Sequence, residues 1–218
     1  MSELEWDGRL DGDDEYCYRP ETTLIVLADT IAKKHGLDPA LVCALCEVES
    51  SWIPWAVRHE AGYKWIVGFH KMTLAEAYSD ISFIDADENW WAFEPQVINE
   101  FPGSAQTELL MQQTSWGLLQ IMGATARERG FRGWLTELCD PQVNLEWGCK
   151  HLRWMELNAD SYGIELCADV STVPTRLCGL PQSLAAAWNA GSVRYGEDGK
   201  LINVDYVRRA AKAMEGYQ

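Results

Sequence analysis

The stretch DPALVCALCEVESSWIPWAV, residues 38–57, contains a helix start, an apolar helix face and two glutamates. Asp38 is a favourable N-cap and Pro39 suits the first helical position, so a helix is predicted from Pro39 to about Ser51. Wound at about 100° per residue, this helix gathers large apolar side chains on one stripe, which comprises Leu41, Leu45, Val48 and Trp52. The stretch therefore predicts a helix in the core of a helical protein.

The two glutamates of this helix have different expected environments. Glu49 falls within the apolar arc, between Val42 and Leu45, whereas Glu47 falls on the far side near Cys43. An apolar environment disfavours a charged carboxylate, so we expect a raised pKa for Glu49. A carboxylic acid that keeps its proton near neutral pH can protonate a glycosidic oxygen. The alternative is that Glu49 lies at the rim of the stripe and reaches water or an arginine.

Helix signals continue through most of the chain. Gly36 and Gly130 are suited to end helices, and Asp140 followed by proline repeats the start seen at Asp38. We expect further helices over residues 21–34, 115–129, 141–158, 184–190 and 204–215, with a helical piece near 73–80. Because the alternation typical of strands is scarce, the predicted fold class is all-α.

The composition restricts the possible partners. The 218 residues include 33 acids and 18 bases, which gives a formal net charge of −15. Phosphate-rich partners need lysine and arginine, so neither nucleic acid nor an anionic membrane surface is expected as a partner. No run of about 18 apolar residues is present, so stable membrane insertion is not expected either. The seven cysteines are expected to be reduced and mostly buried.

The chain is expected to form a single domain with two additions. Residues 1–20 are rich in acids and are predicted to be a solvated N-terminal arm, so the folded domain is expected over 21–218. Residues 61–113 are too long for a plain connection and are predicted to be an insertion that forms a wall or lid. Within the insertion, Trp90 and Trp91 offer flat faces that can stack on sugars. The alternative is a self-packed loop that only covers the core.

Four short motifs follow one another along the chain. They are ESSWIPWAV at 49–57, SWGLLQIM at 115–122, AAWNAG at 186–191 and DYV at 205–207. This series resembles the soluble lytic transglycosylases of the lysozyme-like superfamily, and its first two motifs are similar to those of phage-borne members. The resemblance covers roughly residues 22–60 and 114–215. It implies a lysozyme-like domain whose partner is the glycan strand of peptidoglycan.

The resemblance also implies roles for individual residues. Glu49 would be the general acid and base, and Tyr206 would point its hydroxyl at Glu49. Ser50 would hydrogen-bond the N-acetyl or lactyl side of the substrate. Gln120 would line the groove from a facing helix, and Asn189 would order its turn and touch sugar.

Two positions depart from the family pattern. Leu119 stands where methionine is usual, which keeps an apolar contact but loses the adaptability of sulfur. Trp188 stands where tyrosine is usual, which removes a hydroxyl and adds a larger face to this substrate-binding position. We therefore expect the details of sugar contact, and not the fold, to differ from the family.

The implied reaction is cleavage of the β-1,4 bond between N-acetylmuramic acid and N-acetylglucosamine. Glu49 would protonate the leaving oxygen and then, as a base, activate the muramoyl 6-hydroxyl, which closes a 1,6-anhydro ring. One alternative is a hydrolytic muramidase on the same fold, for which Glu60 is the nearest second carboxylate unless it is paired with Arg58. Another is a non-catalytic wall-binding or tail-structural protein.

No cofactor or metal is expected. Cys43 and Cys46 lie side by side as small core residues, and no second pair completes a tetrahedral zinc site. The first residues lack the basic and apolar regions of a secretory signal. The chain is therefore expected to be made in a cytoplasm and to act on the cell wall after release or delivery, as a phage endolysin, a tail-associated enzyme or a cellular enzyme would.

Overall fold

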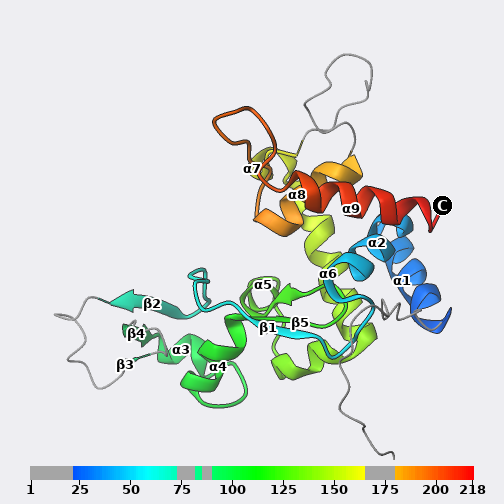
Figure 1. Ribbon diagram of the computed structural model, residues 1–218. Coiled ribbons are helices and arrows are strands. Elements are labelled where there is room, and N and C mark those ends of the chain that lie inside the picture. The colour runs from blue at the N-terminus through cyan, green and yellow to red at the C-terminus, as the bar shows by residue number, and fades with distance from the viewer. Residues whose placement is uncertain (1–21, 73–81, 85–89, 165–179) are drawn as a thin grey trace, which may run out of the picture.

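The computed structural model describes residues 22–72, 82–84, 90–164 and 180–218. These residues form a helical part and a smaller part in which short strands and helices are mixed (Figure 1). In chain order the elements are α1 Thr22–His35, α2 Pro39–Ser50, β1 Val57–His59, β2 Phe69–Met72, β3 Ser82–Ile84, β4 Trp90–Phe93, α3 Pro95–Ile98, α4 Ala105–Gln112, β5 Thr114–Trp116, β6 Ile121–Met122, α5 Gly123–Glu128, the 3₁₀ helix η1 Leu135–Cys139, α6 Pro141–Leu157, α7 Ala159–Tyr162, α8 Leu180–Ala190 and α9 Val204–Glu215.

The helical core is built around α2. This helix packs against α1, α8 and α9 (Figure 1). All seven residues from Ala40 to Cys46 are buried, so its first two turns are enclosed on every side, as the apolar sequence requires. The packing of α9 on α2 brings Tyr206, in the first turn of α9, beside Glu49, and this contact positions the site.

Both predicted helix starts are confirmed. Asp38 accepts a hydrogen bond from the Ala40 amide at 2.9 Å, and Asp140 accepts one from the Val143 amide at 3.0 Å. The proline that follows each aspartate lies in the first turn, where its missing N–H has no helical partner to lose. The helices predicted over 21–34, 141–158, 184–190 and 204–215 correspond to α1, α6, α8 and α9.

The helix predicted over 115–129 is wrong in its first half. β5, a turn and β6 occupy residues 114–122, and the helix α5 begins only at Gly123. Two residues of the turn have a positive φ, 67° at Gly117 and 49° at Gln120, a conformation that an α-helix excludes. The motif SWGLLQIM is therefore a strand–turn–strand unit, although its apolar residues also suit a helical period.

Two small antiparallel sheets were not predicted. One has the order β1-β5-β6, with Val57 opposite Trp116, and the other has the order β2-β4-β3, with Lys71 opposite Trp91. Each strand has only two to four residues. Alternation cannot be recognised over so few positions, so the sequence pattern contained no visible sign of them. The fold is nevertheless mostly helical, as expected.

The insertion has a small core of its own. Its buried members are Ile66, Phe69, Trp91, Ile98, Phe101 and Leu109. Trp91 has no exposed surface, so the prediction that it stacks on sugar is wrong. The side chain of Trp90, the helical piece predicted near 73–80 and the acidic arm at 1–20 lie outside the described part of the chain.

The four cysteines within the described residues, Cys43, Cys46, Cys139 and Cys149, are free. Burial raises the pKa of Cys43 to about 12, which keeps this thiol neutral as a small core side chain. Among the residues that the structure describes, no helix is long and apolar enough to cross a membrane, and no group of three potential ligands could hold a metal ion.

A buried ion pair joins the insertion to the rest of the domain. Arg127 on α5 donates from Nε and Nη2 to both carboxylate oxygens of Glu108 on α4, at 2.7 and 2.9 Å. Neither side chain is exposed by more than 1%. Arg127 also donates to the carbonyls of Phe131 and Gly133, so its charge is fully hydrogen-bonded.

Removal of one partner of this pair should be strongly destabilising. Glu108→Ala leaves the guanidinium of Arg127 buried and without its carboxylate, so we expect the free energy of unfolding to fall by about 3–5 kcal/mol in a urea titration. Asp29→Ala is the control, because its pair with Lys33 on the surface of α1 is exposed, and its loss should change stability by less than about 1 kcal/mol. Equal effects of the two substitutions would contradict this account.

Candidate active site

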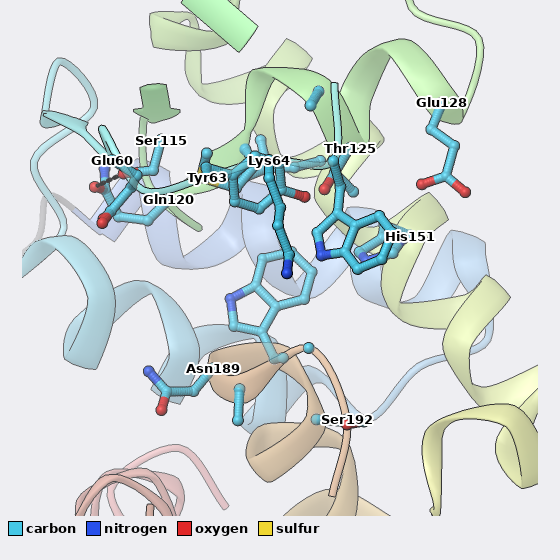
Figure 2. Close-up of a pocket in the computed structure, with 18 of the residues that line it drawn as sticks. Glu60, Tyr63, Lys64, Ser115, Gln120, Thr125, Glu128, His151, Asn189 and Ser192 are labelled. Atoms are coloured by element: carbon cyan, nitrogen blue, oxygen red, sulfur yellow. Dashed lines mark hydrogen bonds between the residues drawn. The ribbon is translucent and has the colours of Figure 1, made fainter. Parts of the chain in front are cut away.

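A groove of about 1330 Å³ lies between the helical core and the first part of the insertion. Its walls come from the end of α2, the segment after β1, the turn between β5 and β6, α5, α6 and the end of α8. Figure 2 shows Glu60 and Gln120 near one end, Glu128 and His151 near the other, and Asn189 on the opposite side. Three of the four sequence motifs supply lining residues, and the fourth supplies Tyr206, which contacts Glu49.

Glu49 is a partly buried carboxyl in the wall of this groove. Desolvation raises its pKa, as its position in the apolar arc predicted. Hydrogen bonding to the Tyr206 hydroxyl and to the Trp188 side chain, and the charges of Arg58 and Arg209, act in the opposite direction. The carboxyl therefore holds its proton more tightly than an ordinary glutamate does. After it loses the proton, the Tyr206 hydroxyl can stabilise the carboxylate by a hydrogen bond.

The hydroxyl of Tyr206 donates to Glu49 Oε1 at 2.6 Å. Tyr206 lies in the first turn of α9, and packing of α9 on α2 buries most of its ring. Burial and the adjacent Glu49 carboxyl both raise the pKa of Tyr206, so the phenol stays protonated and can donate to the Glu49 carboxylate. This is the contact between the two residues that the family resemblance implied.

Gln120 lines the groove, but it is not on a helix. It lies in the turn between β5 and β6, and its side-chain amide forms hydrogen bonds to other groups of the protein. Nε2 donates to the carbonyls of Ala56 and Gly117, both at 2.9 Å, and Oε1 accepts from the Ser115 hydroxyl at 2.9 Å. The side chain therefore holds the turn against the segment that follows α2, and the groove surface depends on it.

Asn144 is a positioning residue that the sequence analysis missed. From the buried face of α6 it accepts from the Leu119 amide and donates to the carbonyls of Trp116 and Leu138, each at 2.8 Å. A Cβ at Gly117 would come within 2.3 Å of Asn144 Nδ2, so glycine is required there. In the sequence, the sign of this role was limited to the place of Asn144 in the first turn of the helix predicted over 141–158, on a face that is otherwise apolar.

The expected contact of Ser50 with substrate is not supported. Ser50 is only 7% exposed and is not among the residues that line the groove. Its hydroxyl lies 2.9 Å from the carbonyl of Cys46 and 2.8 Å from that of Leu118, and both are acceptors. Ser50 therefore ties the end of α2 to the turn that follows β5, which is a structural role.

Trp188 and Asn189 lie at the end of α8 and line the groove. The indole of Trp188 lies near enough to lower the pKa of Glu49, and its ring centroid is 5.7 Å from that of His151. Asn189 is exposed, and its Oδ1 accepts from Asn203 Nδ2 at 3.0 Å. Asn203 also donates to the carbonyl of Ala186, so these bonds tie the start of α9 to the end of α8. Contact of Asn189 with sugar stays a prediction.

Several other residues of the groove were not predicted. Tyr63, Lys64 and Trp65 form part of its wall in the insertion, and His151 lines it from α6. Burial, together with the charge of Arg129, lowers the pKa of His151 to about 3, so its imidazole is neutral near pH 7. No motif connects these residues to one another, because the packing of a loop, residues 61–68, near α6 brings them to the same groove.

The model of the Transglycosylase SLT domain family matches residues 91–201, and the chain belongs to this family. The match includes Gln120 and Asn189 but begins after Glu49 and ends before Tyr206. No curated protein and no solved structure gives a significant match. The protein is a peptidoglycan lytic transglycosylase with a lysozyme-like fold.

The raised pKa of Glu49 predicts a pH-dependent effect on stability. Below the unfolded pKa, about 4.5, this carboxyl is protonated in both states, whereas at higher pH the folded state resists its ionisation and loses stability. Glu49→Gln should therefore be at least as stable as wild type in urea at pH 7 and should lose that advantage near pH 4. Glu47→Gln on the exposed side of α2 is the control. A Glu49→Gln protein that is much less stable at pH 7 would contradict the assignment.

Proposed function

We propose that Glu49 is the general acid and base of this transglycosylase, and that cleavage leaves 1,6-anhydromuramoyl ends. The observation that carries the proposal is the environment of its carboxyl. It faces the groove, burial raises its pKa, and the Tyr206 hydroxyl holds it at 2.6 Å. A carboxylic acid with these properties can donate a proton near neutral pH.

In the first step the Glu49 proton passes to the glycosidic oxygen between the muramoyl and glucosaminyl rings. The O–H bond forms as the bond from that oxygen to muramoyl C1 breaks, and the glucosaminyl 4-hydroxyl leaves. Positive charge at C1 is shared with the ring oxygen and with the acetamido group of the substrate. Glu49 is left as a carboxylate, and hydrogen bonding to Tyr206 and Trp188 stabilises that charge.

In the second step the Glu49 carboxylate takes the proton of the muramoyl 6-hydroxyl. At the same time the oxygen of that hydroxyl bonds to muramoyl C1. The ring closes, Glu49 regains its proton, and no water is consumed. Intramolecular attack has an effective molarity on the order of 10⁵ M or more in well-oriented systems, so an aligned 6-hydroxyl outcompetes water. One carboxyl can thus serve both steps, because burial favours its acid form and the two donors favour its base form.

The alternative product is a reducing end from hydrolysis. Glu60 favours this alternative because its carboxyl lines the same groove as Glu49. However, Glu60 accepts a hydrogen bond from Arg58 Nε and forms an ion pair with it, which opposes its use as a nucleophile or base. We therefore rank hydrolysis second. The similarity to phage-borne members and delivery to the cell wall stay predictions from the sequence.

Glu49→Gln should abolish most of the activity without unfolding the protein. Loss of the proton donor is expected to lower kcat on purified sacculi by about 10²-fold or more. Glu47→Gln removes a carboxyl from the same helix outside the groove and should retain wild-type activity. Turbidity clearing of sacculi measures both. Clearing by folded Glu49→Gln at more than a third of the wild-type rate would refute the role of Glu49.

The product distinguishes the two mechanisms. Muropeptides from a limit digest should carry muramoyl ends that resist borohydride reduction and are lighter by one water than hydrolytic ends. Mass analysis before and after reduction measures this directly. Ends that are all reducible would establish hydrolysis, and loss of activity in Glu60→Gln would then identify the second carboxylate.

Tyr206→Phe should change the pH profile. The substitution removes a hydrogen bond that lowers the pKa of Glu49, so this pKa rises further. Because the free enzyme needs a protonated acid, the alkaline limb of kcat/KM should move to higher pH while kcat falls. Tyr217→Phe is a matched control, since the Tyr217 hydroxyl donates to Glu47 at 2.6 Å. An alkaline limb that stays in place in Tyr206→Phe would contradict the assignment of Glu49.

A further inference from the structure

We propose that Lys64 is a specificity residue that binds a carboxylate on the substituent of the muramoyl ring. The proposal rests on the assignment of this groove as the glycan site. Lys64 belongs to the insertion and lines the groove together with Glu49. Figure 2 shows its side chain extending from the upper wall into the middle of the groove. An exposed ammonium in that position can meet a group that projects from a bound glycan strand.

The backbone on both sides of Lys64 is fixed by two buried glutamines. Gln113 accepts from the Glu60 amide at 2.7 Å through its carbonyl and donates from Nε2 to the Tyr63 carbonyl at 3.3 Å. Gln112 bonds both backbone groups of Val67, at 2.8 and 3.0 Å. Lys64 and its neighbour Trp65 are the residues left facing outward between these anchors, so their position along the groove is set by buried hydrogen bonds.

The two described arginines of the groove have hydrogen-bond partners within the protein. Arg58 pairs with Glu60, and Arg194 donates to the carbonyl of Ala190. The ammonium of Lys64 lies 5.5 Å from the ring centroid of Trp65, and no carboxylate pairs with it among the described residues. In a chain of net charge −15, an unneutralised ammonium in the groove indicates that the missing anion comes from the substrate.

The acids of the groove do not compete for Lys64. Glu60 is paired with Arg58, and Glu128 is paired with Arg129. Glu49 has a raised pKa and is held by Tyr206. Among the described residues, Lys64 therefore presents to a ligand an ammonium that has no carboxylate partner. It lies beside the flat and 73% exposed face of Trp65, which can pack on a sugar ring.

The two amino sugars of the strand are themselves uncharged, so the anion must come from the muramoyl substituent. A stem peptide supplies free carboxylates at its own residues, while its bond to the lactyl group removes the lactyl charge. A strand without stems instead exposes the lactyl carboxylate. The chemistry at Lys64 is the same in both cases, and the two sources place the charge at different distances from the ring.

The test compares Lys64→Ala with wild type on four substrates. They are intact sacculi, strands freed of stems by an amidase, and each of these after carbodiimide-coupled amidation of its carboxylates. We expect kcat/KM of Lys64→Ala to fall about 2- to 5-fold on at least one charged substrate, mainly through KM, which is the range of an exposed ion pair. On both amidated substrates the variant and wild type should be equal. A loss confined to intact sacculi identifies the stem, and a loss confined to stripped strands identifies the lactyl group.

Two controls separate charge at this position from general effects. Lys33→Ala removes the same charge from the surface of α1, where Lys33 pairs with Asp29, and should not alter KM. Lys64→Arg should restore binding of the charged substrates. Equal KM values for Lys64→Ala and wild type on both charged substrates would overturn the proposal, as would an equal loss on the amidated ones. These ratios do not depend on whether the product is anhydro or reducing, so failure here is distinct from failure of the proposed mechanism.

Discussion

The hydrogen bond between Tyr206 and Glu49 is the interaction on which the site depends. It joins residues 157 positions apart in the chain and exists because α9 packs directly on α2. Burial alone would make Glu49 a poor base, and full hydration would make it a poor acid. The short hydrogen bond from Tyr206 and the nearby indole of Trp188 offset part of the desolvation and favour the charged form, although the net shift of the Glu49 pKa is upward. The packing of the helical core therefore sets the environment of the Glu49 carboxyl.

Buried polar networks then fix the walls around that carboxyl. Asn144 holds the turn between β5 and β6, and Gln120 fastens the same turn to the segment after α2. On the insertion side, Arg127 binds Glu108, Glu108 accepts from Gln112, and Gln112 bonds Val67 beside the groove. Satisfied polar networks of this kind rigidify a surface, because each member would be costly to leave unpaired. The groove is thus fixed largely by side chains behind its surface, among them Asn144, Arg127 and Glu108.

The sequence predicted the parts of this structure that depend on local rules. The N-caps at Asp38 and Asp140, the long amphipathic helices and the environment of Glu49 follow from residue type and helical period, and the structure agrees with them. The family resemblance added Tyr206 and placed it correctly. The turn at Gly117 was missed because its positive φ and its contact with Asn144 are tertiary features.

Other errors have the same origin. Trp91 was predicted to face a sugar, but the insertion needs it for a core, and a tryptophan in sequence does not reveal which use it has. Ser50 was assigned to substrate from the motif alone, whereas the fold uses its hydroxyl between α2 and the turn. Lys64 and Trp65 follow no motif, so only the anchoring of their segment reveals them.

A direct titration of the Glu49 carboxyl tests the central claim most closely. In protein labelled with ¹³C at the glutamate side chains, the Glu49 carboxyl resonance can be assigned by its absence from the spectrum of Glu49→Gln and followed as a function of pH. The account predicts a midpoint clearly above the ordinary glutamate value of 4.5, set by burial next to the Tyr206 hydroxyl. A midpoint at or below that value would show an ordinary carboxylate at neutral pH and would contradict the assignment of Glu49 as the proton donor.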